Sequence, residues 1–490
     1  MTSPLPRLGL ESLDRASPTL ERPAYSPRAA KIGVMHFGPG AFHRAHQAYI
    51  FHRLLSKDLR WGVSGVSLRS SDLQVALDPQ DGLYVLAQRD QQERFLTIGS
   101  LRERLTAPLA RQLVIQRLLS PDLRLVTSTI TEKGYCLSSS GDLDTEHQDI
   151  RADLANWEAP STFIGWLYLG LKLRRAAGMA PFLTAPCDNL SDNGGKLARA
   201  VASYADRLDR DMADWLRGER PFVSTMVDSI TPATDDALRA MVADLCGVYD
   251  AWPVQREAFV QWVIEQDGRL GDADWQDAGV QITTDIAAFE RAKLRLLNGA
   301  HSLLAYLGLG AGVETVAEAC NSTPLALAVE RLWDEVQPLL APASGLDLVK
   351  YRPALMGRFR NPVIIHKLSQ IAWDGSQKVP VRLMTSLVEA LARGLPTEMI
   401  ALAIAGWMRF CVAAARSGRE IVDPLAADLQ RLGRAASDLP TDVDAFLEAA
   451  GIFNDSARTP LARAKLRDAY QGLVVLGEFG AIERTLRAID

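Results

Sequence analysis

The chain has 490 residues, more than one ordinary hydrophobic core accommodates, so two domains are expected. Its apolar fraction of 48% and charged fraction of 23% are typical of a soluble globular protein. The formal net charge of -5, without any basic run, gives no reason to expect a nucleic-acid partner. The most apolar stretches, residues 302–313 and 400–408, are too short to span a bilayer, so we expect no membrane partner.

Residues 1–30 are polar and proline-rich and lack the apolar segment of a signal peptide. We interpret them as an N-terminal tail or a strap on the surface. The five cysteines lie far apart, with no CxxC or CxxH spacing that would indicate a structural metal or a disulfide framework. Each is expected to be a small buried hydrophobic residue in a protein of the reducing cytoplasm.

Strand-like runs and helical patterns alternate after this segment. The strand-like runs cover residues 31–38, 61–68, 123–130 and 180–185, and the helical patterns cover 45–55 and 163–177. This order predicts a parallel α/β sheet with right-handed crossovers.

From about residue 283 the pattern changes to successive amphipathic helices with few strands. The clearest of these helices are predicted at residues 325–339, 381–393 and 397–415. We therefore predict an N-terminal tail over 1–30, an α/β domain over 31–282 and a mostly helical domain over 283–490.

The segment HFGPGAFHRAHQ places Gly38 and Gly40 between the first strand and its helix. Glycines let the backbone approach a pyrophosphate, and the free N–H groups at a helix start bind its charge. His43 stands where a third glycine is usual, so the motif is weak alone; its place on the first strand strengthens it. Arg44 is either a phosphate contact or a solvent-exposed helix residue.

Two features near this loop concern other ligands. His36, His43 and His46 fit packing better than a metal site, because no cysteine or carboxylate accompanies them at ligand spacing. An acidic residue after the second strand would bind the ribose of NAD, whereas an arginine would accommodate the phosphate of NADP. Here Leu68 is followed by Arg69, Ser70, Ser71 and Asp72, so both readings stay open.

The segment FERAKLRLLNGAHSLLAYLG carries Lys293, Asn298 and His301 in a helical pattern. At about 100° per residue, Lys293 and His301 lie roughly 80° apart, with Asn298 about 60° beyond His301 and Glu290 close to His301. The rise from Lys293 to His301 is ~12 Å, so a reacting carbon would sit between them. The alternative is a surface helix with scattered polar residues, but long apolar runs flank these groups.

Lysine suits alcohol oxidation without a metal. Its reference pKa of ~10.4 falls when the amine is desolvated, which makes it a base for the hydroxyl proton. Two amides would stabilise the developing alkoxide, as an oxyanion hole does. Asn298 offers one, and Asn189, in the segment TAPCDNLSDNGG after a predicted strand, offers the other.

These residues carry a resemblance that extends over nearly the whole chain. The spacing Lys293-x4-Asn298-x2-His301 resembles the signature of the mannitol dehydrogenase family, the polyol-specific long-chain dehydrogenases. Further similar segments are HFGPGAFHRAHQ, TITEKGYC, PCDN, VDSITP, LRLLNGAHS and DGSQKVP, all in the expected order. The resemblance implies a Rossmann-type N-terminal domain, a mostly helical C-terminal domain, NAD or NADP as cofactor, and no metal.

The resemblance also implies roles for individual residues. Lys293 resembles the family's general acid/base, Asn189 and Asn298 its oxyanion pair, and Glu290 a glutamate that links the lysine to solvent. The expected substrate contacts are His301, Asp228, His366, Gln370 and Lys378. The expected cofactor contacts are Phe37, Gly38, Gly40, Phe42 and Arg44, with Asp72 as a ribose contact. NAD is expected from the resemblance, and Arg69 keeps NADP open.

The stretch NPVIIHKLSQIAWDGSQKVPVRL resembles the hexuronate branch of the family, which interconverts fructuronate and mannonate, because of His366, Gln370 and Lys378. A sugar acid needs a cation for its carboxylate, and Lys378, Lys367 and Arg382 are the candidates. The alternatives are a mannitol 2-dehydrogenase or an arabinitol dehydrogenase, and, from another class, a binding protein that lost its chemistry. We expect a small-molecule sugar acid or polyol as partner and a monomer or small homo-oligomer.

Overall fold

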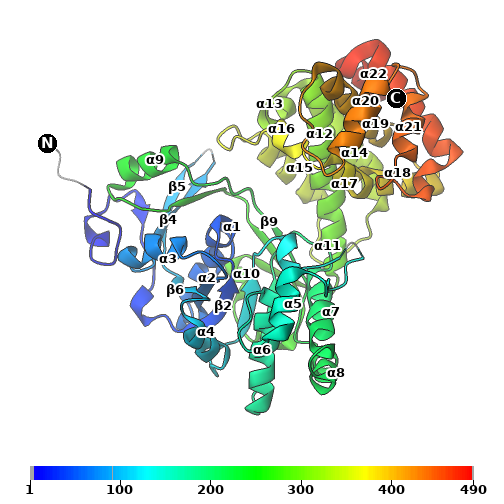
Figure 1. The fold of residues 1–490 in the computed structure, drawn as a ribbon. Coiled ribbons are helices and arrows are strands. Elements are labelled where there is room, and N and C mark those ends of the chain that lie inside the picture. The colour runs from blue at the N-terminus through cyan, green and yellow to red at the C-terminus, as the bar shows by residue number, and fades with distance from the viewer. Residues whose placement is uncertain (1–4, 91, 139, 488–490) are drawn as a thin grey trace. The chain divides into compact units, whose positions relative to one another are not determined.

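The computed structural model describes residues 5–90, 92–138 and 140–487. The chain divides into two compact units between Ala287 and Ala288, a few residues after the boundary expected from the sequence. Each unit is described by itself. In Figure 1 the N-terminal unit runs from blue to green and the C-terminal unit from green to red.

The N-terminal unit is built on a five-stranded parallel sheet in the order β6-β3-β2-β7-β8. The four predicted strands are confirmed, and β6 joins them at the edge. The strands are β2 (Ile32–Phe37), β3 (Gly62–Ser67), β6 (Leu101–Thr106), β7 (Leu125–Ser128) and β8 (Leu183–Pro186). From β2 the chain adds β3 and β6 on one side, and then β7 and β8 on the other side. Doubly wound sheets bind ligands at the point where the strand order reverses in this way, here between β2 and β7.

Both faces of this sheet are covered by helices because side chains alternate along each strand. Val34 belongs to one hydrophobic cluster with α2, whereas Met35 and Phe37 belong to a second with α4, α6 and α7. The helices of this unit are α1 (Ala41–Ala45), α2 (Gln47–Leu55), α3 (Asp72–Leu77), α4 (Arg111–Leu118), α5 (Gln148–Ala155), α6 (Phe163–Ala176), α7 (Asn193–Asp206), α8 (Arg210–Glu219), α9 (Asp236–Cys246) and α10 (Trp275–Ala278).

Two smaller sheets, which the sequence patterns did not reveal, complete this unit. One has the order β1-β5-β4-β10 and the other β12-β11-β9. Their strands are β1 (Leu20–Glu21), β4 (Tyr84–Arg89), β5 (Arg94–Ile98), β9 (Thr225–Asp228), β10 (Val254–Glu257), β11 (Gln261–Glu265) and β12 (Val280–Thr283). β9 ends at Asp228, one of the substrate contacts expected from the sequence.

Of the two interpretations of residues 1–30, a free tail does not fit residues 5–30, which lie against the N-terminal unit as a surface strap would. Leu8, Leu13 and Leu20 are buried in a cluster with β4, β5 and α9, and β1 pairs in parallel with β5. The polar, proline-rich composition hid three leucines that are spaced too irregularly to form an amphipathic pattern. This segment is therefore an integral part of the N-terminal unit.

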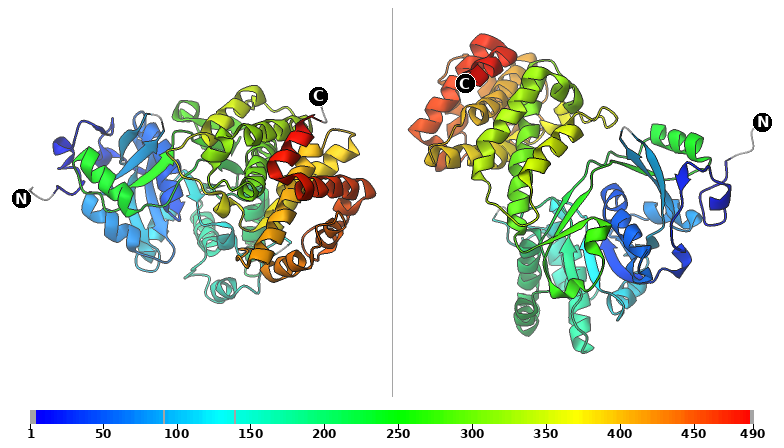
Figure 2. Two further views of the ribbon diagram at one scale, coloured as in Figure 1. Left: turned by 90° about the horizontal axis from the view of Figure 1, so that it is seen from above. Right: turned by 180° about the vertical axis from the view of Figure 1, so that it is seen from behind.

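In the C-terminal unit the described elements are helical (Figure 2). They are α11 (Ile286–Ala292, which starts just before the unit boundary), α12 (Gly299–Gly310), α13 (Val316–Asn321), α14 (Thr323–Val336), α15 (Leu348–Phe359), α16 (Leu368–Ile371), α17 (Gly375–Val379), α18 (Thr385–Ala392), α19 (Glu398–Ser417), α20 (Ala426–Ala435), α21 (Asp442–Glu448) and α22 (Pro460–Arg487). The predicted helices at residues 325–339, 381–393 and 397–415 correspond to α14, α18 and α19.

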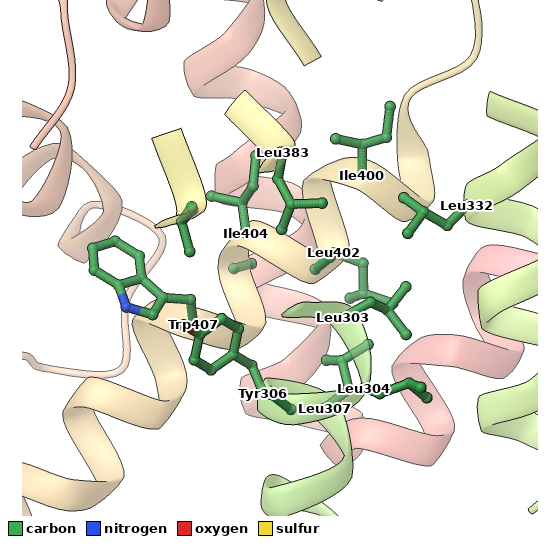
Figure 3. Packing of buried hydrophobic residues seen from close by; sticks show 14 of the residues in the cluster. Leu303, Leu304, Tyr306, Leu307, Leu332, Leu383, Ile400, Leu402, Ile404 and Trp407 are labelled. Atoms are coloured by element: carbon green, nitrogen blue, oxygen red, sulfur yellow. The ribbon is translucent and has the colours of Figure 1, made fainter. Parts of the chain in front are cut away.

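α19 is the core helix of this unit. Figure 3 shows Leu303, Tyr306 and Leu307 of α12 in one cluster with Ile404 and Trp407 of α19. α19 is the one described helix that is long and apolar enough to cross a membrane, but 78% of its apolar window is buried inside the protein. Such burial is typical of a core helix. Because α12 packs against α19, this contact also fixes the polar groups at the N-terminal end of α12.

A buried carboxyl group holds the start of α19. Glu335 of α14 accepts hydrogen bonds from Met399 N (2.9 and 3.1 Å) and Ile400 N (2.9 Å). These N–H groups belong to the first turn of α19, where they lack partners within the helix. Burial raises the pKa of Glu335 to about 7, although the two N–H groups act to lower it. The ionised form is therefore costly in the folded state.

We predict that Glu335 makes the unfolding free energy depend on pH. Its pKa is higher in the folded state than in the unfolded chain, so the folded state binds more protons between about pH 4.5 and 7. Stability should fall as pH rises through that window, by up to about 3 kcal/mol. Urea unfolding at pH 5, 6.5 and 8 should show a smaller decrease for Glu335→Gln than for wild type. Glu330→Gln, on the same helix but half-exposed, is the control, and an equal pH slope in all three proteins would contradict the assignment.

Candidate active site

A cavity of about 760 Å³ opens at the carboxyl ends of β2, β3 and β7 in the N-terminal unit. Its walls come from three loops: residues 38–40 after β2, residues 68–73 after β3 and residues 129–136 after β7. These strands flank the point where the chain order reverses, which is the usual ligand position in doubly wound sheets. The cavity therefore lies where the sequence predicts the dinucleotide.

The glycine loop forms because Gly38 has no side chain. Its φ is +81°, and an ideal Cβ there would lie 2.3 Å from the Thr129 carbonyl oxygen. Gly38 N donates to Val66 O (2.9 Å), and Thr129 Oγ1 donates to Gly38 O (2.7 Å), so the loop is held by both neighbouring strands. Gly40 caps α1, and a Cβ there would meet only Gly38 O, at 3.9 Å. Gly38 is required by the turn, whereas Gly40 leaves open backbone for a ligand.

The structure places the expected cofactor residues in different surroundings. Gly38, Gly40, Arg44 and Asp72 line the cavity. Phe37 is fully buried in the sheet core, with its ring 5.1 Å from that of Phe163. Phe42 is half-buried and stacks on His46 with ring centroids 5.0 Å apart.

Arg44 is not the solvent-exposed helix residue that the sequence left open. It is 1% exposed, and its guanidinium lies over the rings of Tyr84 and Trp252. Its Nη1 donates to Trp252 O (2.5 Å). Arg44 thus brings Trp252, itself a wall of the cavity, next to the glycine loop. Burial lowers the pKa of this guanidinium to about 10, so it stays charged at neutral pH.

The histidines near the loop pack within the fold. His36 and His43 stack with ring centroids 3.4 Å apart, and His36 bonds to the hydroxyls of Thr127 (2.7 Å) and Thr129 (3.0 Å). Burial lowers the pKa of His36 to about 3, so the ring is neutral. Among the residues that the structure describes, no three His, Cys, Asp or Glu side chains are grouped to hold a metal ion.

In the C-terminal unit, the segment that carries Lys293, Asn298 and His301 is not the regular α-helix assumed from its periodicity. Residues Lys293–Asn298 form a π-helical turn between α11 and α12, closed by a hydrogen bond from Gly299 N to Leu294 O. Trp333 Nε1 donates to Leu296 O (2.9 Å) inside this turn. The angles derived from 100° per residue are therefore wrong here, because i→i+5 bonding widens the turn.

A second π-helical turn, Pro380–Met384, joins α17 to α18 and packs against the first. A Cβ on Gly299 would lie 3.6 Å from the Arg382 carbonyl oxygen, so the two backbones are close. Arg382 Nη1 lies 3.4 Å from Ser302 Oγ, one residue after His301. The pair of turns brings Arg382 to the same end of α12 as Lys293 and His301.

The buried His301 and the half-buried His366 form a pair at this end of α12. Their ring centroids are 5.1 Å apart in an edge-to-face arrangement, and Phe359 packs on His301 at 4.9 Å. His301 Nε2 and His366 Nδ1 are buried and have no hydrogen-bond partner within the described residues. A buried nitrogen without a hydrogen-bond partner lowers the stability of the fold. These two nitrogens therefore indicate where a ligand would bind.

Positive charge surrounds this histidine pair. Burial, then the neighbouring His366 ring and the cations Arg382, Arg358 and Lys293, hold the pKa of His301 well below its usual value. Burial and Arg358 lower the pKa of His366 in the same way. Both rings are therefore neutral at pH 7. Arg358 of α15 was missed by sequence reasoning, because no motif surrounds it.

The remaining predicted residues are placed as follows. Glu290 is half-buried on α11, one turn before Lys293. Gln370 is exposed on α16, and Lys378 of α17 is half-buried with its Nζ 3.8 Å from Asp374 Oδ2. In the N-terminal unit, Asn189 is exposed in the loop after β8, and Asp228 is buried at the end of β9.

The loop that carries Asn189 is tied to the cavity by Asp188, which sequence reasoning quoted only as part of PCDN. Asp188 accepts hydrogen bonds from Thr131 N (2.7 Å), Tyr135 Oη (2.8 Å) and Ser128 Oγ (3.3 Å). Burial raises the pKa of Asp188 to about 6, against these hydrogen bonds. The loops after β7 and β8 are thus joined through one buried carboxyl group.

Comparison with known proteins identifies this arrangement. The Mannitol dehydrogenase Rossmann domain matches residues 32–277, and the Mannitol dehydrogenase C-terminal domain matches residues 285–474. The chain belongs to the mannitol dehydrogenase family. It is 37% identical to the D-mannonate oxidoreductase of Escherichia coli, over 89% of this chain and 91% of that protein.

Other members of the mannitol dehydrogenase family are equally similar. The mannitol 2-dehydrogenase of Neosartorya fischeri is 37% identical, over 88% of each chain. The solved structure of Pseudomonas fluorescens mannitol 2-dehydrogenase, a ternary complex with NAD and D-mannitol, superimposes with a TM-score of 0.83 and 34% identity, over 98% of this chain and 99% of that chain. The predicted family, fold class and enzyme class are confirmed: this protein is a dehydrogenase that acts on the CH–OH groups of polyols or sugar acids.

We predict that substitutions at Gly38 and Gly40 will distinguish the structural role of the first from the ligand-binding role of the second. Gly38→Ala should lower stability, by about 1–3 kcal/mol from the left-handed backbone alone, and should also abolish dinucleotide binding. Gly40→Ala should leave the melting temperature nearly unchanged and yet weaken dinucleotide binding, because its Cβ meets no neighbouring strand. Thermal unfolding and fluorescence titration with NADH would measure both effects. Equal destabilisation by the two substitutions would refute this division of roles.

Proposed function

We propose that this protein interconverts D-fructuronate and D-mannonate, with NAD as the preferred cofactor and without a metal. The observation that carries the proposal is the positively charged surroundings of His301 and His366, to which Arg358, Arg382 and Lys293 contribute. A carboxylate is the ligand that such surroundings favour.

The residues of the C-terminal unit suit acid–base chemistry at an alcohol carbon. Lys293 takes the hydroxyl proton during oxidation and returns it to the oxygen during reduction. Asn298, on the same π-helical turn, acts as an amide donor that stabilises the alkoxide. His301, being neutral, offers Nε2 to a substrate hydroxyl. Glu290 relays the proton between Lys293 and solvent. When bound, the nicotinamide dinucleotide accepts or supplies the hydride.

The residues of the N-terminal cavity fit such a dinucleotide. Gly38 and Gly40 would admit its pyrophosphate, and Asp72, which lines the same cavity, would contact its ribose. The buried, charged Arg44 adds a cation behind the loop. NAD is bound in the Pseudomonas fluorescens relative, which supports NAD as the preferred cofactor here.

Among the cations considered for the carboxylate, Arg382 is the best placed. Lys378 is engaged with Asp374, and Lys367 is exposed. Arg382 is half-buried, and burial lowers its pKa, so a bound anion would relieve a desolvated charge. Asp228, His366, Gln370 and Lys378 remain proposed contacts for the rest of the substrate.

Mannitol 2-dehydrogenase is the second candidate, favoured by the equal identity to the fungal enzyme. For either activity we propose a cytoplasmic enzyme, consistent with five buried free cysteines, that works as a monomer or small homo-oligomer on a small molecule.

We predict that Lys293→Ala lowers kcat by about 10²–10⁴-fold, which is what general acid–base catalysis contributes. NADH binding, measured by fluorescence, should stay intact, because Lys293 lies outside the cofactor cavity of the N-terminal unit. Lys367→Ala, which removes an exposed lysine, is the control. Retention of more than about a tenth of wild-type turnover would rule out Lys293 as the acid/base.

We also predict that Arg382 discriminates between charged and neutral substrates. A charge-assisted hydrogen bond to a carboxylate is worth about 1.5–3 kcal/mol, or one to two decades in affinity. Arg382→Met should therefore lower kcat/KM for fructuronate more than for fructose, and Lys378→Met should do so to a smaller extent. Lys367→Met should leave the ratio unchanged. If wild type reduces fructose as well as fructuronate, or if Arg382→Met weakens both equally, the protein is a mannitol 2-dehydrogenase instead.

A further inference from the structure

The end of β3 forms the part of the cofactor cavity where Rossmann enzymes read the adenosine ribose. In this chain β3 ends at Ser67, and the residues that follow into the cavity wall are Leu68, Arg69 and Ser70. The first acidic residue, Asp72, begins α3. The position directly after the strand therefore offers an arginine instead of a carboxylate.

A carboxylate reaches this place from another helix. Asp149 lies in the first turn of α5, and its Oδ2 is 3.0 Å from Arg69 Nη2. Both residues line the cavity. His147 caps α5 by accepting a hydrogen bond from Asp149 N (3.2 Å) and also lines the cavity. The ion pair thus spans the cavity wall between the loop after β3 and the start of α5.

Two features fix Asp149 more firmly than Arg69. The Asp149 side chain is 37% exposed and that of Arg69 is 86% exposed. Asp149 also lies in the first turn of α5, whose backbone N–H groups attract a negatively charged side chain. Arg69 sits on a loop, where a long side chain moves easily. When the pair opens, Arg69 is the partner that swings away.

We propose that Asp149 is the residue that selects NAD over NADP in this protein. It engages the one guanidinium that follows β3 into the cavity wall, and it adds a negative charge that repels a 2′-phosphate. This inference rests on the dinucleotide part of the proposed function and is independent of the sugar substrate. Because the pair is exposed, its strength is modest, and NADP is disfavoured without being excluded.

The magnitude follows from the exposure of the pair. An exposed ion pair is worth about 0.2–1 kcal/mol, so the need to open it weakens phosphate binding by up to about fivefold. Removing the carboxylate also removes its repulsion of the phosphate. Asp149→Asn should therefore tighten binding of a 2′-phosphorylated ligand by roughly three- to tenfold. It should change binding of the unphosphorylated ligand by less than about twofold.

The test uses ligands without a nicotinamide, so it does not depend on turnover. Isothermal titration of the full chain with ADP-ribose and with 2′-phospho-ADP-ribose gives the ratio of dissociation constants for wild type, Asp149→Asn, Arg69→Ala and the double variant. Arg69→Ala should weaken binding of the phosphorylated ligand, and in its background Asp149→Asn should have a smaller effect than in wild type. Glu146→Gln, which removes another exposed carboxylate paired with an arginine, is the control and should leave the ratio unchanged.

Different outcomes separate the two proposals. An unchanged ratio in Asp149→Asn, or a change as large in Glu146→Gln, overturns the role of Asp149 while leaving the dinucleotide site intact. If wild type binds neither ligand, the cavity is not a dinucleotide site and both proposals fail. A wild type that binds the phosphorylated ligand more tightly overturns the selection of NAD.

Discussion

In the C-terminal unit, the direction of the side chains proposed to act on the substrate depends on two adjacent helical turns that close i→i+5 hydrogen bonds. Gly299 N reaches Leu294 O in one turn, and Thr385 N reaches Pro380 O in the other. A π-helical turn is less stable than a regular one, and it persists where surrounding structure holds it. Here Trp333 donates to a carbonyl of the first turn, and Thr385 Oγ1 donates to Pro380 O (2.9 Å) at the second. Lys293, Asn298 and Arg382 all project from these widened turns.

The polar groups at the N-terminal end of α12 lower the stability of the fold. The packing of the apolar remainder of the helix compensates for this loss. His301 and His366 each bury a ring nitrogen without a partner among the described residues, at a cost of about 1–3 kcal/mol apiece. From Leu303 to Leu307 the helix is buried against α19, whose own start is held by Glu335. The same burial keeps both imidazoles neutral, because a charged ring would be desolvated beside Arg358 and Arg382. The packing of the apolar core thus offsets the free-energy cost of burying these polar groups. A ligand that paired with them would remove that cost.

The sequence patterns predicted those structural features that depend on residues close together in the chain. The strand endings and the apolar helices follow from periodicity. The glycine loop follows from Gly38, where a positive φ and the nearby Thr129 carbonyl leave no room for a Cβ. The π-helical turns escaped prediction because their apolar spacing is close to that of an α-helix. Arg358 and Asp149 escaped because only the tertiary fold brings α15 and α5 beside residues distant in sequence. The buried leucines of the first thirty residues escaped for the same reason.

Features that only the tertiary fold creates also govern the choice of substrate, because the chain is equally similar to a mannonate enzyme and to mannitol enzymes. Discrimination between the two substrates has to come from side chains that contact them. In this protein the candidates are charges delivered by separate helices: Arg358 and Arg382 around the histidine pair, and Asp149 beside the loop after β3. A positive charge selects for an anionic group and a negative charge selects against one, so substrate and cofactor are distinguished by the same physical principle with opposite sign.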